Sequence, residues 1–228
     1  SAEKENARLE AERAHMKSSL LRGIGHDLRT PLTGIQCGVS YIADHADTLD
    51  RAELRRLAAD ISGQVGWLIT LVENILYMTR IDNDRLEPNC QCEVVDDVVN
   101  DALSHVPELA ARKFTVRLPE SVTVVPMDGH MVVQVLVNLL ENAVRHTSPE
   151  CPIALSAAPA AGRMVFTVED GGPGVSPAER ERIFESFVTE GKTGPDGRPG
   201  MGLGLAICKA VAAAHRGGIA VDDSPALG

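Results

Sequence analysis

His26 is the residue of this chain whose surroundings most suggest chemistry. It is followed by Asp27, and a carboxylate beside an imidazole can accept the Nδ1 proton and leave Nε2 as a nucleophile near neutral pH. Thr30 comes one helical turn after His26 and would lie on the same face. A lone histidine beside an acid is also a common surface residue, so this pattern alone leaves both interpretations open.

The residues around His26 have the periodicity of an amphipathic helix. Apolar side chains recur at steps of three and four from Ile24 to Ile42, which is one helical stripe. At about 100° per residue, His26 lies on the side opposite this stripe and should face solvent. Pro31 has no N–H, so the carbonyl of Asp27 loses its helical partner and the helix can bend there.

A second long helix is predicted after a short polar turn. Asp50 and Glu53 have capping-box spacing, and apolar residues recur in threes and fours from Leu54 to Ile75. An antiparallel hairpin of two such helices leaves its apolar stripe half covered, so we expect two chains to form a four-helix bundle. Residues 1–20 predict a helical lead-in with a thin heptad-like seam, or a solvated helix without a partner.

Beyond a polar stretch at residues 82–88, which marks a domain boundary, helical and strand patterns mix without regular alternation. We expect helices at residues 94–106, 129–145, 177–184 and 201–214, and strands at residues 114–118, 121–125, 153–157, 164–168 and 217–221. This order predicts an α+β sandwich with one helical layer on one mixed sheet.

Composition narrows the classes of partner. A net charge of −10 gives no basic surface for nucleic acid, and an acidic surface is repelled by anionic lipid headgroups. The 5 scattered cysteines indicate free thiols in a reducing cytoplasm. No run of 18 apolar residues occurs, and the chain begins with Ser1 rather than Met. We therefore expect an excised piece, with any membrane segment outside it.

The predicted helix at residues 129–145 carries groups suited to a magnesium nucleotide. Asn138 and Asn142 share one face, and Arg145 follows one turn later. Amide oxygens are ligands for Mg²⁺, and a guanidinium can hold a phosphate. A polar network inside an apolar helix is the alternative interpretation of the same pair.

Two glycine-rich segments add to this set. Asp170 to Gly174 follows a strand, where a carboxylate can accept a hydrogen bond from an exocyclic amine and glycines let the backbone approach a flat base. Pro199 to Leu205 opens a helix whose first N–H groups suit phosphates. Each is weak alone: the first can be a simple turn, and the second is neither a P-loop nor a dinucleotide fingerprint.

In this order and spacing, the three segments resemble the N, G1 and G2 boxes of the histidine-kinase, gyrase and heat-shock-type ATP-binding fold. Ile183 to Phe187 resembles the F box, and His26 to Pro31 resembles the phospho-acceptor box His-Asp/Glu-x-x-Thr/Asn-Pro of sensor histidine kinases. The resemblance covers nearly all of residues 10–222. It implies a helical lead-in (1–20), a dimerisation and histidine phosphotransfer domain (21–86) and a catalytic ATP-binding domain (87–228). The first is an all-α antiparallel hairpin forming a dimeric four-helix bundle, and the last an α+β sandwich of GHKL (Bergerat) type.

The same resemblance implies site residues for ATP and Mg²⁺. Asn142 would bind Mg²⁺, Asn138 and Arg145 would lie by the phosphates, and Asp170 would bind the adenine amine. The other ATP-binding residues would be His146, Gly172, Gly174, Phe184, Phe187, Gly200, Gly202, Leu203 and Gly204. Residues 188–199 have the composition of a mobile lid, in which Lys192 or Arg198 reaches the γ-phosphate or is only a solvated charge.

Three positions distinguish this sequence within the pattern. His146 stands where the family usually has Tyr or Phe, so adenine stacking is weaker or made by the imidazole, and Arg145 replaces the commoner Lys. Asn138 stands where the ATP-hydrolysing relatives have Glu. An amide cannot act as a base, which favours slow hydrolysis and transfer to His26.

The resemblance implies a catalytic cycle. ATP would phosphorylate Nε2 of His26, with Asp27 orienting and deprotonating the imidazole, and the group would pass to an aspartate of a response regulator receiver domain. Thr30 would position water for a phosphatase activity on that regulator. The chain would be the cytoplasmic part of a membrane-anchored bacterial sensor. The alternatives are a non-catalytic nucleotide-binding dimer scaffold and a GHKL-type ATPase.

Overall fold

The computed structural model of the chain describes residues 25, 28–82, 86–185 and 202–224. Contacts divide the chain into two units, Ser1–Ile75 and Leu76–Gly228. Helix α2, Arg51–Asp82, contributes most of its length to the first unit and its last turns to the second. None of the helices in the described ranges is long and apolar enough to cross a membrane.

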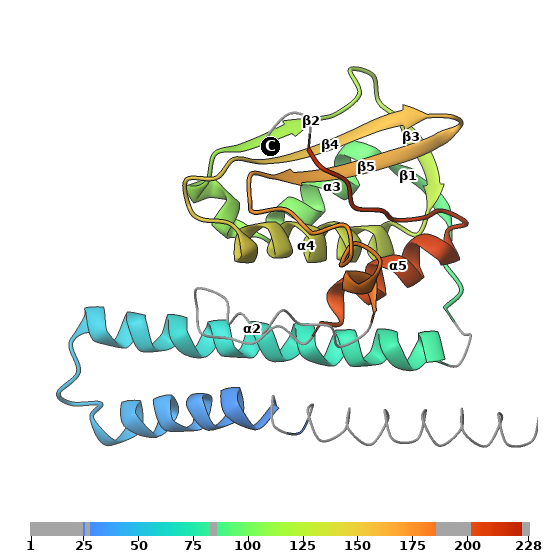
Figure 1. Cartoon of the computed structure of the whole chain (residues 1–228). Coiled ribbons are helices and arrows are strands. Elements are labelled where there is room, and N and C mark those ends of the chain that lie inside the picture. Colours follow the sequence, from blue (N-terminus) through green and yellow to red (C-terminus); the bar gives the residue numbers. More distant parts are fainter. Residues whose placement is uncertain (1–24, 26–27, 83–85, 186–201, 225–228) are drawn as a thin grey trace, which may run out of the picture. The chain divides into compact units, whose positions relative to one another are not determined.

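The first unit is a helical hairpin, as predicted (Figure 1). A helix covers residues 28–44, a turn follows at residues 45–48, and α2 runs back along the first helix. The Glu53 N–H donates to Oδ1 of Asp50 at 2.7 Å, so Asp50 caps α2 as its position predicted. This cap satisfies one of the N–H groups that the first turn of α2 leaves without a helical partner.

The two helices of the hairpin approach closely at two glycines that lie one turn apart. A Cβ placed on Gly34 would lie 2.3 Å from Oε1 of Gln64, and a Cβ on Gly38 would lie 3.1 Å from Cδ1 of Ile61. The hairpin covers only part of its apolar surface. Leu32, Val39, Val65, Ile69 and Val72 remain exposed on the single chain.

The second unit contains two small sheets. β1 (Gln91–Val94) pairs antiparallel with β3 (Val124–Met127). In the other sheet, β4 (Ile153–Ala160) lies between β2 (Phe114–Arg117), to which it is parallel, and β5 (Arg163–Asp170), to which it is antiparallel. The three-stranded sheet is mixed, which confirms the predicted α+β class. The prediction of a single sheet is wrong for the described residues, because β1 and β3 pair apart from the other strands.

The helices of this unit are α3 (Val95–Ser104), α4 (Gly129–His146) and α5 (Gly204–Ala214), with short 3₁₀ turns η1 (Pro107–Ala111) and η2 (Arg182–Phe184). α3 and α4 lie on one face of the three-stranded sheet (Figure 1). Their aliphatic faces and β4 form the main core, in which Val99, Leu136, Leu140 and Leu155 are fully buried. This core fixes α4 firmly against the sheet.

A smaller apolar cluster joins α5 to its neighbours. It contains Ile207 and Val211 from α5, Leu203 directly before α5, Met131 from α4 and Tyr77 from the last turns of α2. α5 is therefore held on α4 by packing that is separate from the main core.

Several predicted elements differ from the structure. Residues 177–184 do not form one helix: they form turns followed by η2. Ser176 donates its hydroxyl to the Glu179 carboxylate instead of capping a backbone N–H. The predicted strand 121–125 begins only at Val124, because Thr123 bonds back to the Ser121 carbonyl.

The predicted strand at residues 217–221 is also wrong. Residues 217–224 have no strand pairing; side chains hold this segment instead, since Asp223 pairs with Arg180 at 2.5 Å and the Ser224 hydroxyl donates to Glu169 at 2.7 Å. The sequence patterns did not predict β1 or η1. The prediction of free thiols is confirmed, since the five cysteines are unpaired.

Candidate functional site

α4 positions the four N-box residues. Asp128 begins the helix by accepting a hydrogen bond from the Met131 N–H at 3.1 Å. The apolar face of α4 is buried in the core, while its other side changes from buried to exposed toward the C-terminal end. Along that side lie Asn138, which is buried, Asn142 and Arg145, which are half-buried, and His146, which is exposed. The helix thus presents polar groups of increasing accessibility to one region.

Asn138 lies where α4 meets the start of α5. Its side chain is 8% exposed, and a Cβ placed on Gly204 would lie 3.4 Å from its Oδ1. Its Nδ2 group has no hydrogen-bond partner within the described part of the chain. A buried donor without an acceptor is costly, so the arrangement suits a ligand that brings an acceptor.

Cys208 lies beneath Asn138. Burial raises the pKa of the Cys208 thiol to about 12. The thiol is therefore protonated and inert at neutral pH. Cys208 is a packing residue rather than a nucleophile.

The G1 turn, residues 170–174, lies against the C-terminal end of α4. Oδ1 of Asp170 accepts the Gly172 N–H at 2.9 Å, which fixes the carboxylate at the end of β5. A Cβ on Gly172 would lie 2.7 Å from that oxygen and 3.0 Å from Cγ2 of Thr147. Gly174 has a φ of +72°, a left-handed conformation that favours glycine. Gly172 is thus required by the side chains beside it, and Gly174 by its backbone conformation.

The described part of the G2 segment leads into α5. Gly202 has a φ of +63°, Leu203 is buried, and Gly204 is the first residue of α5. No side chain of the described residues caps the N-terminus of this helix, so its first N–H groups are available to an acceptor. Phe184, the predicted F-box residue at the end of η2, is buried, and η2 packs against α5.

The structure therefore brings three predicted segments together: the N box contacts the G1 turn at Thr147 and G2 at Gly204. Thr30 is exposed on the first helix of the hairpin. The remaining predicted residues lie outside the described part of the chain: His26, Asp27, Phe187, Lys192, Arg198 and Gly200.

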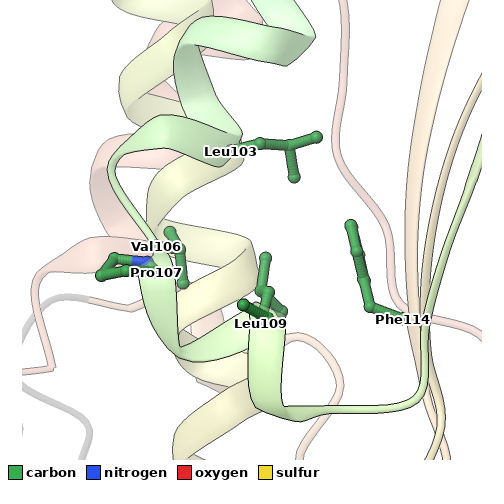
Figure 2. Close-up of a pocket in the computed structure, with 6 residues that line it drawn as sticks. Leu103, Val106, Pro107, Leu109 and Phe114 are labelled. Carbon is green, nitrogen blue, oxygen red and sulfur yellow. The ribbon is translucent and has the colours of Figure 1, made fainter.

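Two hollows were not predicted. A cavity of about 230 Å³ lies between the end of α3, η1 and the start of β2, and Figure 2 shows Leu103, Leu109 and Phe114 around it. It is apolar and contains no predicted site residue. A polar cleft of about 730 Å³ borders the G1 turn at Gly174 and is also lined by Arg180 and Asp223.

Two family models match this arrangement. The His Kinase A (phospho-acceptor) domain matches residues 16–84, and the Histidine kinase-, DNA gyrase B-, and HSP90-like ATPase domain matches residues 127–228. The chain belongs to the sensor histidine kinases. Among curated relatives of this histidine kinase chain, the Sensor protein KdpD of Clostridium acetobutylicum is 37% identical over 220 residues, which is 96% of this chain and 24% of the relative. The chain thus spans about a quarter of the length of this relative and of the Sensor protein KdpD of Escherichia coli.

Solved histidine kinases have the same fold. Full-length ShkA in complex with AMPPNP has a TM-score of 0.61 at 27% identity, over 90% of this chain and 43% of ShkA. ThkA in complex with the response regulator protein TrrA has a TM-score of 0.62 over 98% of this chain and 63% of that one, and at 20% identity it supports the fold alone.

The sequence motifs did not identify two residues of this chain that hold the site in place. Arg112 donates to backbone carbonyls at the end of α4, and no local pattern marks it because its partners lie more than thirty residues away. Asp128 was detectable, since an acidic residue directly before a helical pattern is an N-cap signal. Its further partners, the Asn89 N–H at 2.9 Å and Nε2 of His215 at 3.0 Å, depend on the fold.

Proposed function

We propose that this chain phosphorylates itself on His26 with ATP and transfers the phosphoryl group to an aspartate of a response regulator receiver domain. The observation that carries the proposal is the placement of Asn138, the G1 turn and the N-terminus of α5 along the C-terminal half of α4. These three segments are the predicted contacts to phosphate, adenine and phosphate, respectively.

The described groups fit an adenine nucleotide. The Asn138 Nδ2 donor has no acceptor among the described residues, and a phosphate oxygen would supply one. The first N–H groups of α5 would bind phosphate, and the Asp170 carboxylate, held by Gly172, would accept from the adenine amine. ShkA, which has the same fold, was solved with AMPPNP. Arg145 and His146 extend the site toward solvent.

Magnesium fits the same site through Asn142. This amide is half-buried on the exposed side of α4, and Mg²⁺ keeps several waters and takes few protein ligands when phosphates bind it. The ion would neutralise phosphate charge during transfer. The chain's own contribution is positioning: α4 holds Asn142 and Asn138 on one rigid face.

Phosphoryl transfer to His26, and from His26 to the regulator, would be two successive displacements at phosphorus. The Nε2 lone pair of His26 attacks the γ-phosphorus, the bond from that phosphorus to the bridging oxygen breaks, and ADP leaves. Asp27 accepts the Nδ1 proton, so the phosphohistidine is neutral at the ring. A regulator carboxylate then displaces the phosphoryl group from nitrogen and forms an acyl phosphate. In the phosphatase reaction on the regulator, Thr30 would position water to hydrolyse that acyl phosphate.

Incubation with γ-labelled ATP tests the proposal. We expect label that is acid-labile and base-stable, and we expect its complete loss in His26→Ala. His45→Ala is the matched control, because His45 is an exposed histidine at the hairpin turn, and it should retain the label. Nucleotide binding without label would favour a scaffold. Phosphate release that His26→Ala does not reduce would favour an ATPase.

We also propose that the chain is a homodimer. Val65, Ile69 and Val72 follow one another at steps of four and three on α2, and they are 41%, 54% and 47% exposed on the single chain. This is coiled-coil spacing, and a second copy would cover it. The result would be a four-helix bundle that presents His26 to a response regulator.

The division into a lead-in (1–20), a phosphotransfer domain (21–86) and a catalytic domain (87–228) stays a proposal, and limited proteolysis would test it by cutting near residues 83–88. Membrane anchoring through segments of the longer protein, with this chain on the cytoplasmic side, is likewise proposed. Fractionation of cells that express the complete reading frame would test it.

A further inference from the structure

Arg112 links the end of η1 to the end of α4. Its Nη2 donates to the carbonyl of Val144 at 2.7 Å and to that of Thr147 at 3.3 Å. Its Nη1 donates to Oγ1 of Thr147 at 3.3 Å and to the Ser148 carbonyl. One planar guanidinium thus binds three carbonyls and a hydroxyl, which an ammonium cannot do with the same geometry.

The backbone that carries Arg112 is itself fixed. Val106 and Leu109 of the η1 region are buried in the core, and the Arg112 N–H donates to the Leu109 carbonyl at 3.0 Å. The next carbonyl, that of Lys113, accepts the Ile153 N–H of β4 at 2.9 Å. The guanidinium therefore starts from a rigid position.

The carbonyls that Arg112 binds lie at the end of α4: that of Val144 is in its last turn, and those of Thr147 and Ser148 directly follow the helix. A helix leaves its last four carbonyls without helical partners, and this turn carries Arg145 and His146 on its accessible side. Thr147 donates its hydroxyl to the Ala143 carbonyl at 2.6 Å and places Cγ2 3.0 Å from the Cβ position of Gly172. Thr147 therefore packs against the G1 turn that holds Asp170, and a shift of Thr147 toward Gly172 would press on that turn.

Charge adds to this geometry. The C-terminal end of a helix is its negative pole, and here it lies beside a site proposed for a polyanion. The Arg112 cation binds the exposed carbonyls and offsets that pole. Position and charge thus act in the same direction at this end of α4.

We propose that Arg112 is a positioning residue for nucleotide binding, which sets Thr147 and, through it, the G1 turn. The inference rests on the proposed function only in that the ligand is an adenine nucleotide. It makes a separate statement about the protein without ligand: the guanidinium limits the opening of residues 170–174.

Three variants separate position, charge and stability. Arg112→Met removes both the hydrogen bonds and the charge, and Arg112→Lys keeps the charge without the planar fork. Arg163→Met is the matched control: Arg163 is exposed at the other end of β5, about 23 Å of strand away from Asp170. Binding of Mg–AMPPNP and of ADP is measured by calorimetry well below each variant's unfolding temperature.

We expect Arg112→Met to weaken both nucleotides about tenfold, and Arg112→Lys to weaken them by at least about threefold. Arg163→Met should bind like the unchanged protein. Peptide hydrogen exchange without nucleotide should be faster at residues 170–174 in both Arg112 variants and unchanged at residues 163–167. A residue that only stabilises the fold would lower the melting temperature without these two local changes.

Three outcomes decide the inference. Unchanged affinity and unchanged exchange at residues 170–174 in Arg112→Lys would overturn it, even if Arg112→Met did not fold. Full binding by Arg112→Lys with faster exchange would overturn the link from position to affinity. If the unchanged protein bound no nucleotide, the proposed function would fail, whereas the exchange result would still decide whether Arg112 holds the G1 turn.

Discussion

The proposed contact between Asn138 and a phosphate can be tested at a single atom, Nδ2. Its Nδ2 is buried and has no partner in the described residues, and we propose that a phosphate oxygen accepts from it. Asn138→Asp keeps the shape but replaces the donor with an acceptor beside a polyanion. We expect the affinity for Mg–AMPPNP to fall about a hundredfold, as measured by calorimetry.

Asn74→Asp is the control for this substitution, because Asn74 is also buried and has an unpartnered amide oxygen among the described residues. It should lower stability without changing nucleotide affinity. Equal binding by Asn138→Asp and the unchanged protein would show that Nδ2 does not face a phosphate.

The carboxyl group of Glu141, one residue before Asn142, should make the free energy of unfolding depend on pH. Burial raises the pKa of the Glu141 carboxyl above 4.5, Arg145 lowers it in part, and Glu108 raises it further. Ionisation of Glu141 therefore costs more in the folded protein than in the unfolded chain, so its contribution to the free energy of unfolding falls as the pH rises through and above 4.5.

Glu141→Gln removes this penalty. We expect urea unfolding at pH 7 to shift to higher urea in the variant, and we expect the difference to disappear below the ordinary pKa of 4.5, where both side chains are neutral. A variant less stable than the unchanged protein at pH 7 would mean that the attraction to Arg145 outweighs burial.

At the scale of elements, the long periodic segments could be predicted and the short ones could not. The pattern of α4 specified its position because its apolar face and its Asp128 cap are both local in sequence. β1 and η1 depend on partners far along the chain, so no local pattern marks them. The segment 217–224 has strand-like residues, yet ion-pair and hydroxyl contacts replace strand pairing.

The residues of the candidate site likewise divide into those that the sequence could identify and those that it could not. Asn138, Asn142, Asp170 and Gly204 could be found because their motifs have characteristic order. Arg112 could not be found, because its role arises only when η1 and the end of α4 meet. Sequence motifs name the groups that would touch a ligand, and the fold adds the residues that hold them.

Asp128 connects three parts of the second unit through hydrogen bonds, and the loss of these bonds should lower stability measurably. Oδ1 caps α4, Oδ2 accepts the Asn89 N–H before β1, and the Asp128 N–H donates to Nε2 of His215 after α5. We expect Asp128→Ala to lower the free energy of unfolding by about 1–2 kcal/mol. Asp128→Asn should fall between the two, since one amide oxygen can satisfy only one of the two N–H groups. Denaturation followed by near-ultraviolet dichroism measures the free energy of unfolding. Equal stability of all three proteins would show that Asp128 does not hold these elements together.

At the scale of the whole molecule, the chain combines two units of different design. The hairpin leaves apolar residues exposed on both of its helices, while the second unit buries its aliphatic residues in a core of its own. A unit that is incomplete alone and a unit that is complete alone suit an assembly in which only the hairpin pairs.

Dimerisation through the hairpin can be tested at Ile69, the most exposed of the three seam residues Val65, Ile69 and Val72. In a two-fold symmetric bundle every residue occurs twice, so Ile69→Glu would bury two carboxylates. We expect the dissociation constant of the dimer to rise at least about a hundredfold, which sedimentation velocity would record as a monomer at micromolar concentration. Ala59→Glu places the same charge at an exposed position outside the seam and should leave the dimer intact. Because the second unit has its own core, Ile69→Glu should retain nucleotide affinity, and a monomeric unchanged protein would rule out the pairing altogether.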